Sequence, residues 1–525
     1  MISKIITGTT IGIEGFLIEV EVDISRGLPS FTIVGLPDKA VNESRERILS
    51  AIKNSNIEFP IKKIIINLAP AYIKKTNAIL DLPIACGILE ATKIFSISDT
   101  RFNYIFLGEL SLDGSIKKVK GILPILIHAK KQGIKYAVIP YSNLNEAKLV
   151  SGLNLIPVEN ILDLIEKLNK NEFIKTSEQS NIINIGNQIV YPYDFSEITG
   201  NEYAKRAIEI AAAGMHNLIM VGPPGTGKTM IAKRIVTILP NLTLEEAFET
   251  TAIYSSKGLL SEDEPLIFWR PFRAPHHTSS DISIIGGGKA IQCGEVSLAH
   301  NGVLFFDEFP EFKTNVIQAL REPLEEGSVT VSRASGTIKF PARFMFVAAM
   351  NPCPCGYLGS QKRNCTCTYR QIKQYYNKIS GPILDRIDIQ IEVNELDFTK
   401  YDTDNKGAEK SADIRKRVEK ALKIQQERSK KSKNYYNAFL QNSEINEYVN
   451  IDNISKNLIK NAVEKLNLSP RAYYKILKIA RTIADLEESE KVLPVHISEA
   501  IQYRFFDRKN YFTNDIYFSK IASGF

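Results

Sequence analysis

The chain lacks the features that define several large protein classes. Its 525 residues include only six cysteines, one tryptophan and six histidines. Four of the six cysteines crowd into one short segment, which argues against the disulfide framework of a secreted scaffold. No apolar run approaches the length of a membrane-spanning helix, and the start of the chain lacks the basic-then-apolar order of a secretory signal. These absences predict a cytoplasmic protein with no membrane partner.

Composition and charge leave room for several domains and for a polyanionic partner. The chain is 44% hydrophobic, which at this length is enough for roughly two to four domains. Its formal net charge of +7 permits binding to nucleic acid but does not require it, because mildly basic proteins are common.

Four blocks separate along the chain by residue pattern. Residues 1–170 mix strand-like and helix-like segments, as an α/β domain does. Residues 171–189 are polar and weakly patterned, which is typical of a linker. Residues 190–395 hold the motifs described next, and residues 396–525 are mainly helical in pattern. We therefore predict a multidomain α/β protein with a helical C-terminal domain.

The most informative motif is a glycine-rich segment between a strand pattern and a helix pattern. It fits the phosphate-binding pattern G-x-x-x-x-G-K-[ST]. Leu218–Val221 before it is typical of a buried parallel strand, and the apolar spacing after it predicts a helix that ends before Pro240. Backbone N–H groups of such a loop wrap nucleotide phosphates at the helix N-terminus, so the motif predicts nucleotide binding rather than a surface turn. The residues expected to hold the nucleotide are Gly222, Pro223, Pro224, Gly225, Thr226, Gly227, Lys228 and Thr229.

Two of these side chains and two acids further along predict a site that hydrolyses ATP with Mg²⁺. We expect Lys228 to reach the β- and γ-phosphates and the Thr229 hydroxyl to hold Mg²⁺. Val303–Phe306 has the pattern of a buried strand, and Asp307 and Glu308 follow at its C-terminal end, where ligands bind in open parallel sheets. Asp307 is expected to bind Mg²⁺ and Glu308 to polarise the attacking water, which indicates an ATPase rather than a kinase.

Three further polar residues are each open to two interpretations. Asn351 follows the strand pattern Phe344–Met350, where it could orient a water beside the γ-phosphate or cap a turn. Arg386 lies between two acids, a pattern typical of a salt-bridged surface turn. Arg471 stands at the start of a helix predicted to begin after Ser469, where it could meet a phosphate or solvent.

The crowded cysteines predict either a structural zinc site or free thiols in a rigid loop. Cys353 and Cys355 are followed by Cys365 and Cys367 within one predicted loop. Four converging thiolates suit tetrahedral Zn²⁺, although the C-x-C spacing is tighter than the usual C-x-x-C. No ligand position looks open, so zinc here would be structural rather than catalytic.

Several long motifs together resemble one known family. They are Gly222–Thr229, Arg270–His277, Gly294–Gly302, Val303–Glu308, Asn351–Gly356 and Arg481–Asp485. They are similar to the motifs of the YifB/ComM family, magnesium-chelatase-like ATPases of the AAA+ class, and the likeness covers nearly the whole chain. The resemblance implies a Lon-protease-like N-terminal domain, a central AAA+ domain with a parallel sheet, and a C-terminal helical lid.

The resemblance gives roles to residues that the sequence alone leaves open. Asn351 matches the polar sensor-1 residue, Arg386 the arginine finger offered to a neighbouring subunit's ATP, and Arg471 the sensor-2 residue of the lid. Hydrolysis should then require a ring, which we expect to be a homohexamer. Asp194–Gly200 resembles the segment that lies against adenine, with Asn201 where glutamine is usual.

The family also implies a motor that moves on DNA. We expect a branch-migration helicase acting in recombination or natural transformation; the alternative is a metal-chelatase-type remodelling motor or chaperone acting on a protein partner. Ile284–Lys289 is expected in a pore-lining insertion and Val329–Phe340 in a β-hairpin. Lys289, Arg333 and Lys339 there are candidate contacts to a nucleic-acid backbone or ordinary solvated charges.

Three other features carry further expectations. Ile84 and Leu123 stand near the positions of the Lon-type nucleophile and base, so we expect no peptidase activity. The basic segment Arg415–Lys433 could contact DNA or form a solvated helix face. His276 and His277 are expected to be structural, since no matching metal-ligand spacing lies nearby in the sequence.

Overall fold

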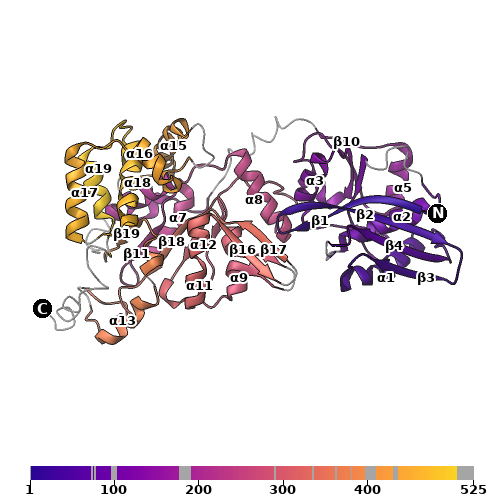
Figure 1. Cartoon of the computed structure of the whole chain (residues 1–525), viewed down its shortest axis with the longest axis horizontal. Coiled ribbons are helices and arrows are strands. Elements are labelled where there is room, and N and C mark those ends of the chain that lie inside the picture. Colours follow the sequence, from indigo (N-terminus) through magenta and orange to yellow (C-terminus); the bar gives the residue numbers. More distant parts are fainter. Residues whose placement is uncertain are drawn as a thin grey trace.

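The structure is a computed structural model of the chain. It describes residues 2–72, 75, 78–95, 103–176, 191–288, 291–333, 336–360, 363–379, 381–395, 409–429, 435–466, 468–504 and 506. Lys289, the expected linker beyond position 176, and the end of the basic segment from position 430 lie outside the described residues. Figure 1 shows the described elements in three groups along the long axis, with the N-terminal group at one end and the C-terminal helices at the other.

The N-terminal group consists of two main sheets and the helices packed against them. One sheet has the strand order β1-β2-β4-β3 and the other β10-β9-β8-β5. In β2, Val20 and Val22 are fully buried, while Glu19 and Glu21, which alternate with them, face the other side and each lie 2.7 Å from Lys4 of β1. This period of two is what gives the sheet one apolar face. The elements are β1 Ile2–Ile11, β2 Glu14–Ser25, β3 Ser30–Val34, α1 Lys39–Asn54, β4 Lys63–Ala69, α2 Asp81–Ala91, β5 Tyr104–Phe106, β6 Glu109–Leu110, β7 Ile116–Lys117, α3 Ile122–Lys131, β8 Tyr136–Pro140, α4 Leu144–Ala147, β9 Asn154–Val158, α5 Ile161–Lys170 and β10 Ile174–Lys175.

The central group is built on a parallel sheet with the strand order β12-β15-β18-β11-β19. The strands β11, β15 and β18 are buried along their whole length, which explains their continuous apolar sequences. The α/β fold class predicted from the sequence is therefore confirmed. The elements of this group are α6 Glu202–Gly214, β11 Leu218–Val221, α7 Lys228–Ile238, α8 Leu244–Lys257, β12 Phe272–Arg273, α9 Asp281–Ile285, β13 Gly286–Gly287, β14 Gln292–Cys293, α10 Glu295–Leu298, β15 Val303–Phe306, α11 Thr314–Ala319, α12 Arg321–Glu326, β16 Ser328–Arg333, β17 Gly336–Pro341, β18 Met345–Met350, α13 Tyr369–Asn377, α14 Gly381–Leu384 and β19 Ile389–Glu392.

The predicted hairpin is confirmed as β16 and β17, which pair in antiparallel register. Arg333 and Lys339 on it are exposed. The hairpin lies beside β13 of the expected insertion, since a Cβ added to Gly287 would stand 3.2 Å from Nη2 of Arg333. It also packs against the N-terminal group: a Cβ on Gly12, in the turn between β1 and β2, would lie 2.5 Å from the side chain of Ile338 (Figure 1).

The C-terminal group consists of helices that pack against α6 and α7. Its elements are α15 Ser411–Arg428, α16 Asn442–Tyr448, α17 Asn453–Leu466, α18 Pro470–Leu486 and α19 Pro494–Gln502. The helix start expected after Ser469 is confirmed, because the Ser469 hydroxyl caps α18 by accepting from the N–H of Ala472. Among the described residues, no helix is long and apolar enough to cross a membrane.

Two arginines in the basic segment of α15 bind groups of the chain itself. Arg415 donates to the carbonyl of Thr237, and Nε of Arg417 lies 2.5 Å from Glu209. These two arginines therefore dock α15 on the central group, which neither interpretation of the segment anticipated.

A buried ion pair joins α18 to the sheet. Lys475 of α18 contacts the carboxylate of Asp388, which directly precedes β19 and lies 3.5 Å from Nδ1 of the buried His216. Burial alone would raise the pKa of Asp388, but the charge of Lys475 and the His216 ring hold that pKa well below its ordinary value. The carboxylate is therefore ionised and depends on Lys475 for its compensation.

We predict that Lys475→Met destabilises the chain by about 3–5 kcal/mol, because it leaves the Asp388 carboxylate buried without its cationic partner. Adding Asp388→Asn in the same chain should recover much of the loss, since the orphaned charge is then gone. Lys420→Met is the control, because Lys420 forms an exposed pair with Glu488 at 3.1 Å and its loss should cost less than about 1 kcal/mol. Denaturant unfolding measures all three variants. Equal losses for Lys475→Met and Lys420→Met would contradict the prediction.

Candidate active site

Parallel strand pairing gathers the predicted nucleotide residues at one edge of the central sheet. Val221, the last residue of β11, pairs with Met350, the last residue of β18, and β18 pairs in turn with β15. The segments that follow these three strands therefore emerge side by side. They begin with Gly222, Asp307 and Asn351, which is where ligands bind in open parallel sheets.

The glycine-rich loop has a backbone that other residues would not adopt easily. Gly225 and Gly227 have φ angles of +81° and +82°, in the left-handed region that favours glycine. A Cβ on Gly222 would stand 2.2 Å from the carbonyl oxygen of Val393, so the first glycine is required by close packing against the chain after β19.

Lys228 is buried at the start of α7 and bonds to the loop itself. Its Nζ donates to the carbonyls of Gly222 and Pro223, each at 2.7 Å, and lies 3.4 Å from Oδ1 of Asn351. Burial lowers the pKa of Lys228 to about 8, although the charge of Asp307 opposes the shift. The expected phosphate ligand and the expected sensor amide are thus in contact.

The two acids after β15 face different partners. The Thr229 hydroxyl donates to Oδ2 of Asp307 at 2.7 Å, so the two expected magnesium ligands meet. Glu308 has a φ of +52°, an uncommon conformation for a residue with a side chain, and its N–H donates to Asp307. Its carboxylate is exposed and lies 3.4 Å from Nδ1 of His277. The expectation that His277 is structural stays a prediction, and the structure adds that its ring faces the carboxylate expected to polarise water.

The two arginines of the predicted site lie at the opposite edge of the sheet. The carbonyl of Arg386 accepts from the side chain of Asn217, the residue before β11, whereas the glycine-rich loop follows the other end of that strand. Four residues of extended strand separate these ends by about 13 Å. Arg386 contacts the carboxylate of Glu325 on α12, and Nη2 of Arg471 lies 3.5 Å from the same carboxylate.

The pair of arginines differs in exposure. The side chain of Arg386 is 14% exposed and donates to the carbonyl of Pro382 at 2.8 Å, while its buried Nε has no hydrogen-bond partner among the described residues. The side chain of Arg471 is 57% exposed. Sequence reasoning missed Glu325, because nothing in a run of surface acids marks the one that two distant arginines share.

The segment Asp194–Gly200 links α7 to α15. The carboxylate of Asp194 accepts from the N–H of Ser411, and Glu197 pairs with Arg234 of α7. Asn201 has a φ of +54°, a left-handed conformation that asparagine tolerates better than most residues. The departure from glutamine at this position is therefore compatible with the local backbone.

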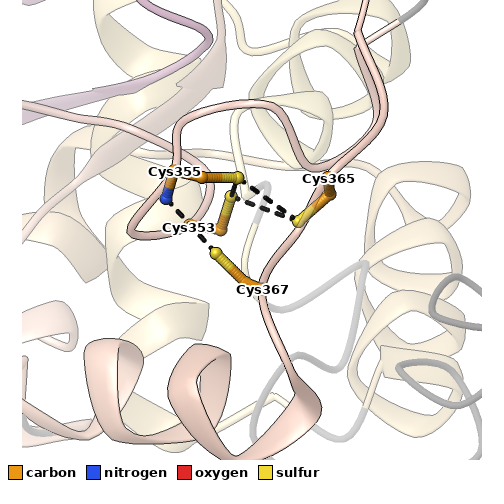
Figure 2. A group of neighbouring side chains, drawn as sticks. All are labelled: Cys353, Cys355, Cys365 and Cys367. Atoms are coloured by element: carbon orange, nitrogen blue, oxygen red, sulfur yellow. Dashed lines mark hydrogen bonds between the residues drawn. The ribbon is translucent and has the colours of Figure 1, made fainter.

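The four-cysteine cluster is formed by Cys353, Cys355, Cys365 and Cys367. It lies beside the edge of the sheet that holds Asn351 and the glycine-rich loop. Figure 2 shows its sulfurs turned toward one another from two chain segments. All four sulfurs lie within 4.8 Å of each other, and all four cysteines are free. Hydrogen bonds from the backbone N–H groups of Tyr357 and Thr366 lower the pKa of Cys355, although its partial burial opposes them.

In the N-terminal group, the two positions compared with a Lon-type nucleophile and base are apolar and inaccessible. Ile84 of α2 and Leu123 of α3 have no exposed surface. The absence of peptidase activity remains a prediction.

Family models cover most of the chain in three consecutive matches. The description "Magnesium chelatase, subunit ChlI" matches residues 194–401, "Subunit ChlI of Mg-chelatase" residues 20–143, and "Magnesium chelatase, subunit ChlI C-terminal" residues 408–504.

Whole-chain relatives agree with these models. The competence protein ComM of Haemophilus influenzae is 42% identical over 94% of this chain and 96% of its own length. The YifB protein of Escherichia coli is 40% identical over 97% of this chain and 98% of its own length. The DNA replication licensing factor mcm6 of Dictyostelium discoideum is 24% identical over 65% of this chain and 38% of its own length. The chain therefore belongs to the YifB/ComM family of magnesium-chelatase-like AAA+ ATPases.

Proposed function

We propose that this chain is one subunit of a ring-shaped, ATP-hydrolysing motor that acts on DNA as a branch-migration helicase. One observation supports assembly into a ring. Lys228 and Glu308 lie at one edge of the central sheet, and Arg386 and Arg471 lie at the other. Arg386 is held at the end of β11 opposite the glycine-rich loop, and Arg471 shares its partner Glu325, so we infer that both arginines serve the nucleotide of a neighbouring subunit. A complete site then needs a second copy of the chain, which supports a ring of identical subunits; the number six is what the family resemblance implies.

The chemistry at the first edge is divided among five side chains. Lys228 neutralises the phosphates, and Asn351, in contact with it, is placed to orient water near the γ-phosphate. Thr229 and Asp307 would hold Mg²⁺, because their paired oxygens are the hard ligands this ion prefers. Mg²⁺, when bound, offsets the charge that develops on the phosphates. Glu308 would draw a proton from the attacking water.

His277 adds a constraint on this water-activating carboxylate. A ring nitrogen 3.4 Å from Glu308 can hold the carboxylate away from the phosphates or release it toward them. We infer that His277 is a positioning residue for Glu308 and does not itself contact the reacting atoms.

DNA as the substrate of the motor is supported by exposed basic residues and by the names of relatives. Arg333 and Lys339 are exposed on the hairpin, which lies beside the insertion expected to line the pore. Relatives named for competence and for DNA replication fit a nucleic-acid substrate. The magnesium-chelatase description of the matching models favours the alternative, a remodelling motor that acts on a protein partner.

The first prediction concerns sites shared between subunits. Arg386→Ala should bind ATP but hydrolyse it at least about 10³-fold more slowly, because an arginine finger is typically worth ~10³–10⁵ in rate. Glu308→Gln should be similarly inactive. Mixing the two inactive proteins should restore part of the ATPase activity, because some interfaces then join an intact Glu308 to an intact Arg386.

The control for this mixing experiment combines two variants whose substitutions lie at the same edge of the sheet. Mixing Arg386→Ala with Arg471→Ala should restore no activity if both arginines serve the neighbour, since no interface then receives both. Recovery in that mixture would place Arg471 in the site of its own subunit. No recovery with Glu308→Gln in assembled rings would contradict the shared site itself.

The second prediction concerns DNA. Forked DNA should raise the ATPase rate of the wild-type chain severalfold, and Arg333→Glu with Lys339→Glu should reduce the ratio of stimulated to unstimulated rate. The matched control is Lys460→Glu with Lys465→Glu, the same charge change at exposed positions of α17. If single-stranded, double-stranded and forked DNA all leave turnover unchanged, the helicase is excluded and the protein-remodelling motor is favoured.

The third prediction follows from the lowered pKa of Lys228. At about pH 7 the amine is mostly protonated, whereas at about pH 9 it is mostly neutral, since its pKa is about 8. Bound phosphates favour the protonated form, so nucleotide binding at about pH 9 should take up a proton and be weaker than at about pH 7. Calorimetry in buffers of different ionisation enthalpy measures this uptake. Equal affinity and no uptake at the higher pH would contradict it.

A further inference from the structure

The four-cysteine cluster has the geometry of a tetrahedral metal site. The sulfur of Cys353 lies 3.3 Å from that of Cys355 and 3.6 Å from that of Cys365, and the last two sulfurs are also 3.6 Å apart. A zinc ion with Zn–S bonds of about 2.3 Å separates its ligands by roughly 3.8 Å. Disulfides, with S–S of about 2.05 Å, are far shorter. The donor set and its spacing fit zinc.

Backbone donors around the cluster also fit a thiolate site. The N–H of Leu358 donates to Sγ of Cys353, and the N–H of Cys355 to Sγ of Cys367, each at 3.3 Å. Such N–H···S bonds stabilise the negative charge of thiolate ligands and fix their directions. Cys353 is fully buried, so the ligands are shielded from solvent on that side.

The cluster joins two segments on opposite sides of a loop. Cys353 and Cys355 follow β18, whereas Cys365 and Cys367 directly precede α13, as the two segments in Figure 2 show. The hydroxyl of Tyr376 in α13 donates to the carbonyl of Pro352 at 2.9 Å, which ties the same two segments together. A metal here would lock the end of β18 to α13.

The locked loop touches the nucleotide site at two points. Asn351, two residues before the first cysteine, lies 3.4 Å from Nζ of Lys228. Gly356 packs on the glycine-rich loop, because a Cβ there would stand 2.8 Å from Cδ of Pro224. The cluster therefore supports the position of both the sensor amide and the phosphate-binding loop.

We propose that the four-cysteine cluster binds one zinc ion, and that this zinc holds the loop containing Asn351 and Gly356 against the glycine-rich loop, so that ATP turnover depends on the metal. The second part rests on the proposed ATPase function, whereas the first part does not. The zinc is a positioning element and does not touch the nucleotide.

The binding of zinc is tested on the purified full-length chain by elemental analysis. We expect about one zinc per chain, and Cys365→Ser should remove most of it. Cys293→Ser is the control, because Cys293 is a buried free cysteine outside the cluster. Protein loaded with Co²⁺ should show the intense thiolate-to-metal absorption of tetrahedral cobalt. Less than about one zinc per two chains, or cobalt spectra without thiolate bands, would overturn the site.

The dependence of turnover on zinc is tested with a zinc-selective chelator in excess Mg²⁺. Loss of zinc should lower the ATPase rate constant at least about tenfold, the usual scale for disturbing a supporting shell, and added zinc should restore it. Circular dichroism and binding of a fluorescent ATP analogue should persist, which separates misplacement of Asn351 from unfolding. Unchanged turnover in zinc-free protein would overturn the coupling.

Two glycine variants test the contact between the loops without altering a ligand. Gly356→Ala and Gly359→Ala both put a side chain at a positive φ, +88° and +81°, but only Gly356 would meet Pro224. We expect Gly356→Ala to keep its zinc and lose at least about tenfold in turnover, and Gly359→Ala to stay within about twofold of wild type. Equal effects would overturn the contact. Wild-type protein that holds zinc but hydrolyses no ATP would refute the proposed function and leave the metal site standing.

Discussion

Parallel pairing of β11, β15, β18 and β19 divides the chemistry of this chain between two edges of one sheet. Residues that follow the strands, such as Lys228 and Glu308, collect at one edge, while Arg386, which precedes β19, is fixed at the other. No side-chain rearrangement can close that separation, because the strands between the two edges are buried on both faces. On the proposed roles of these residues, each subunit would carry half of a catalytic site at each edge, and association would be part of catalysis.

The buried pair of Asp388 and Lys475 lies close in sequence to both Arg386 and Arg471. Asp388 is two residues from Arg386 in sequence, and Lys475 stands about one helical turn beyond Arg471 on α18. Buried ion pairs add little net stability, since desolvation offsets most of their attraction, but they tolerate few alternative arrangements. The pair therefore ties α18 to the start of β19. Both arginines then reach the shared carboxylate of Glu325.

Sequence reasoning succeeded where chemistry is local and failed where it depends on distant partners. The strands around Asp307 and Asn351 and the start of α18 follow from runs of a few residues, and the structure has them as expected. The contact of His277 with Glu308 joins the segments that follow β12 and β15, and the residues next to His277 in the sequence do not predict it. In the basic segment, counting charges could not reveal that Arg417 is held by Glu209, some two hundred positions away.

The helix α8 makes hydrogen bonds to both the C-terminal and the N-terminal group. At its first turn, Glu246 accepts from Arg270 and from Tyr435 of the C-terminal group. Near its last turn, Ser255 donates to Glu146 at 2.5 Å, and that carboxylate is buried enough that its pKa is raised despite its hydrogen bonds. Separating α8 from the N-terminal group would cost free energy, because the buried carboxyl group of Glu146 would lose its hydrogen bond to Ser255. A helix about 21 Å long thus contacts the C-terminal group near its start and the N-terminal group near its end.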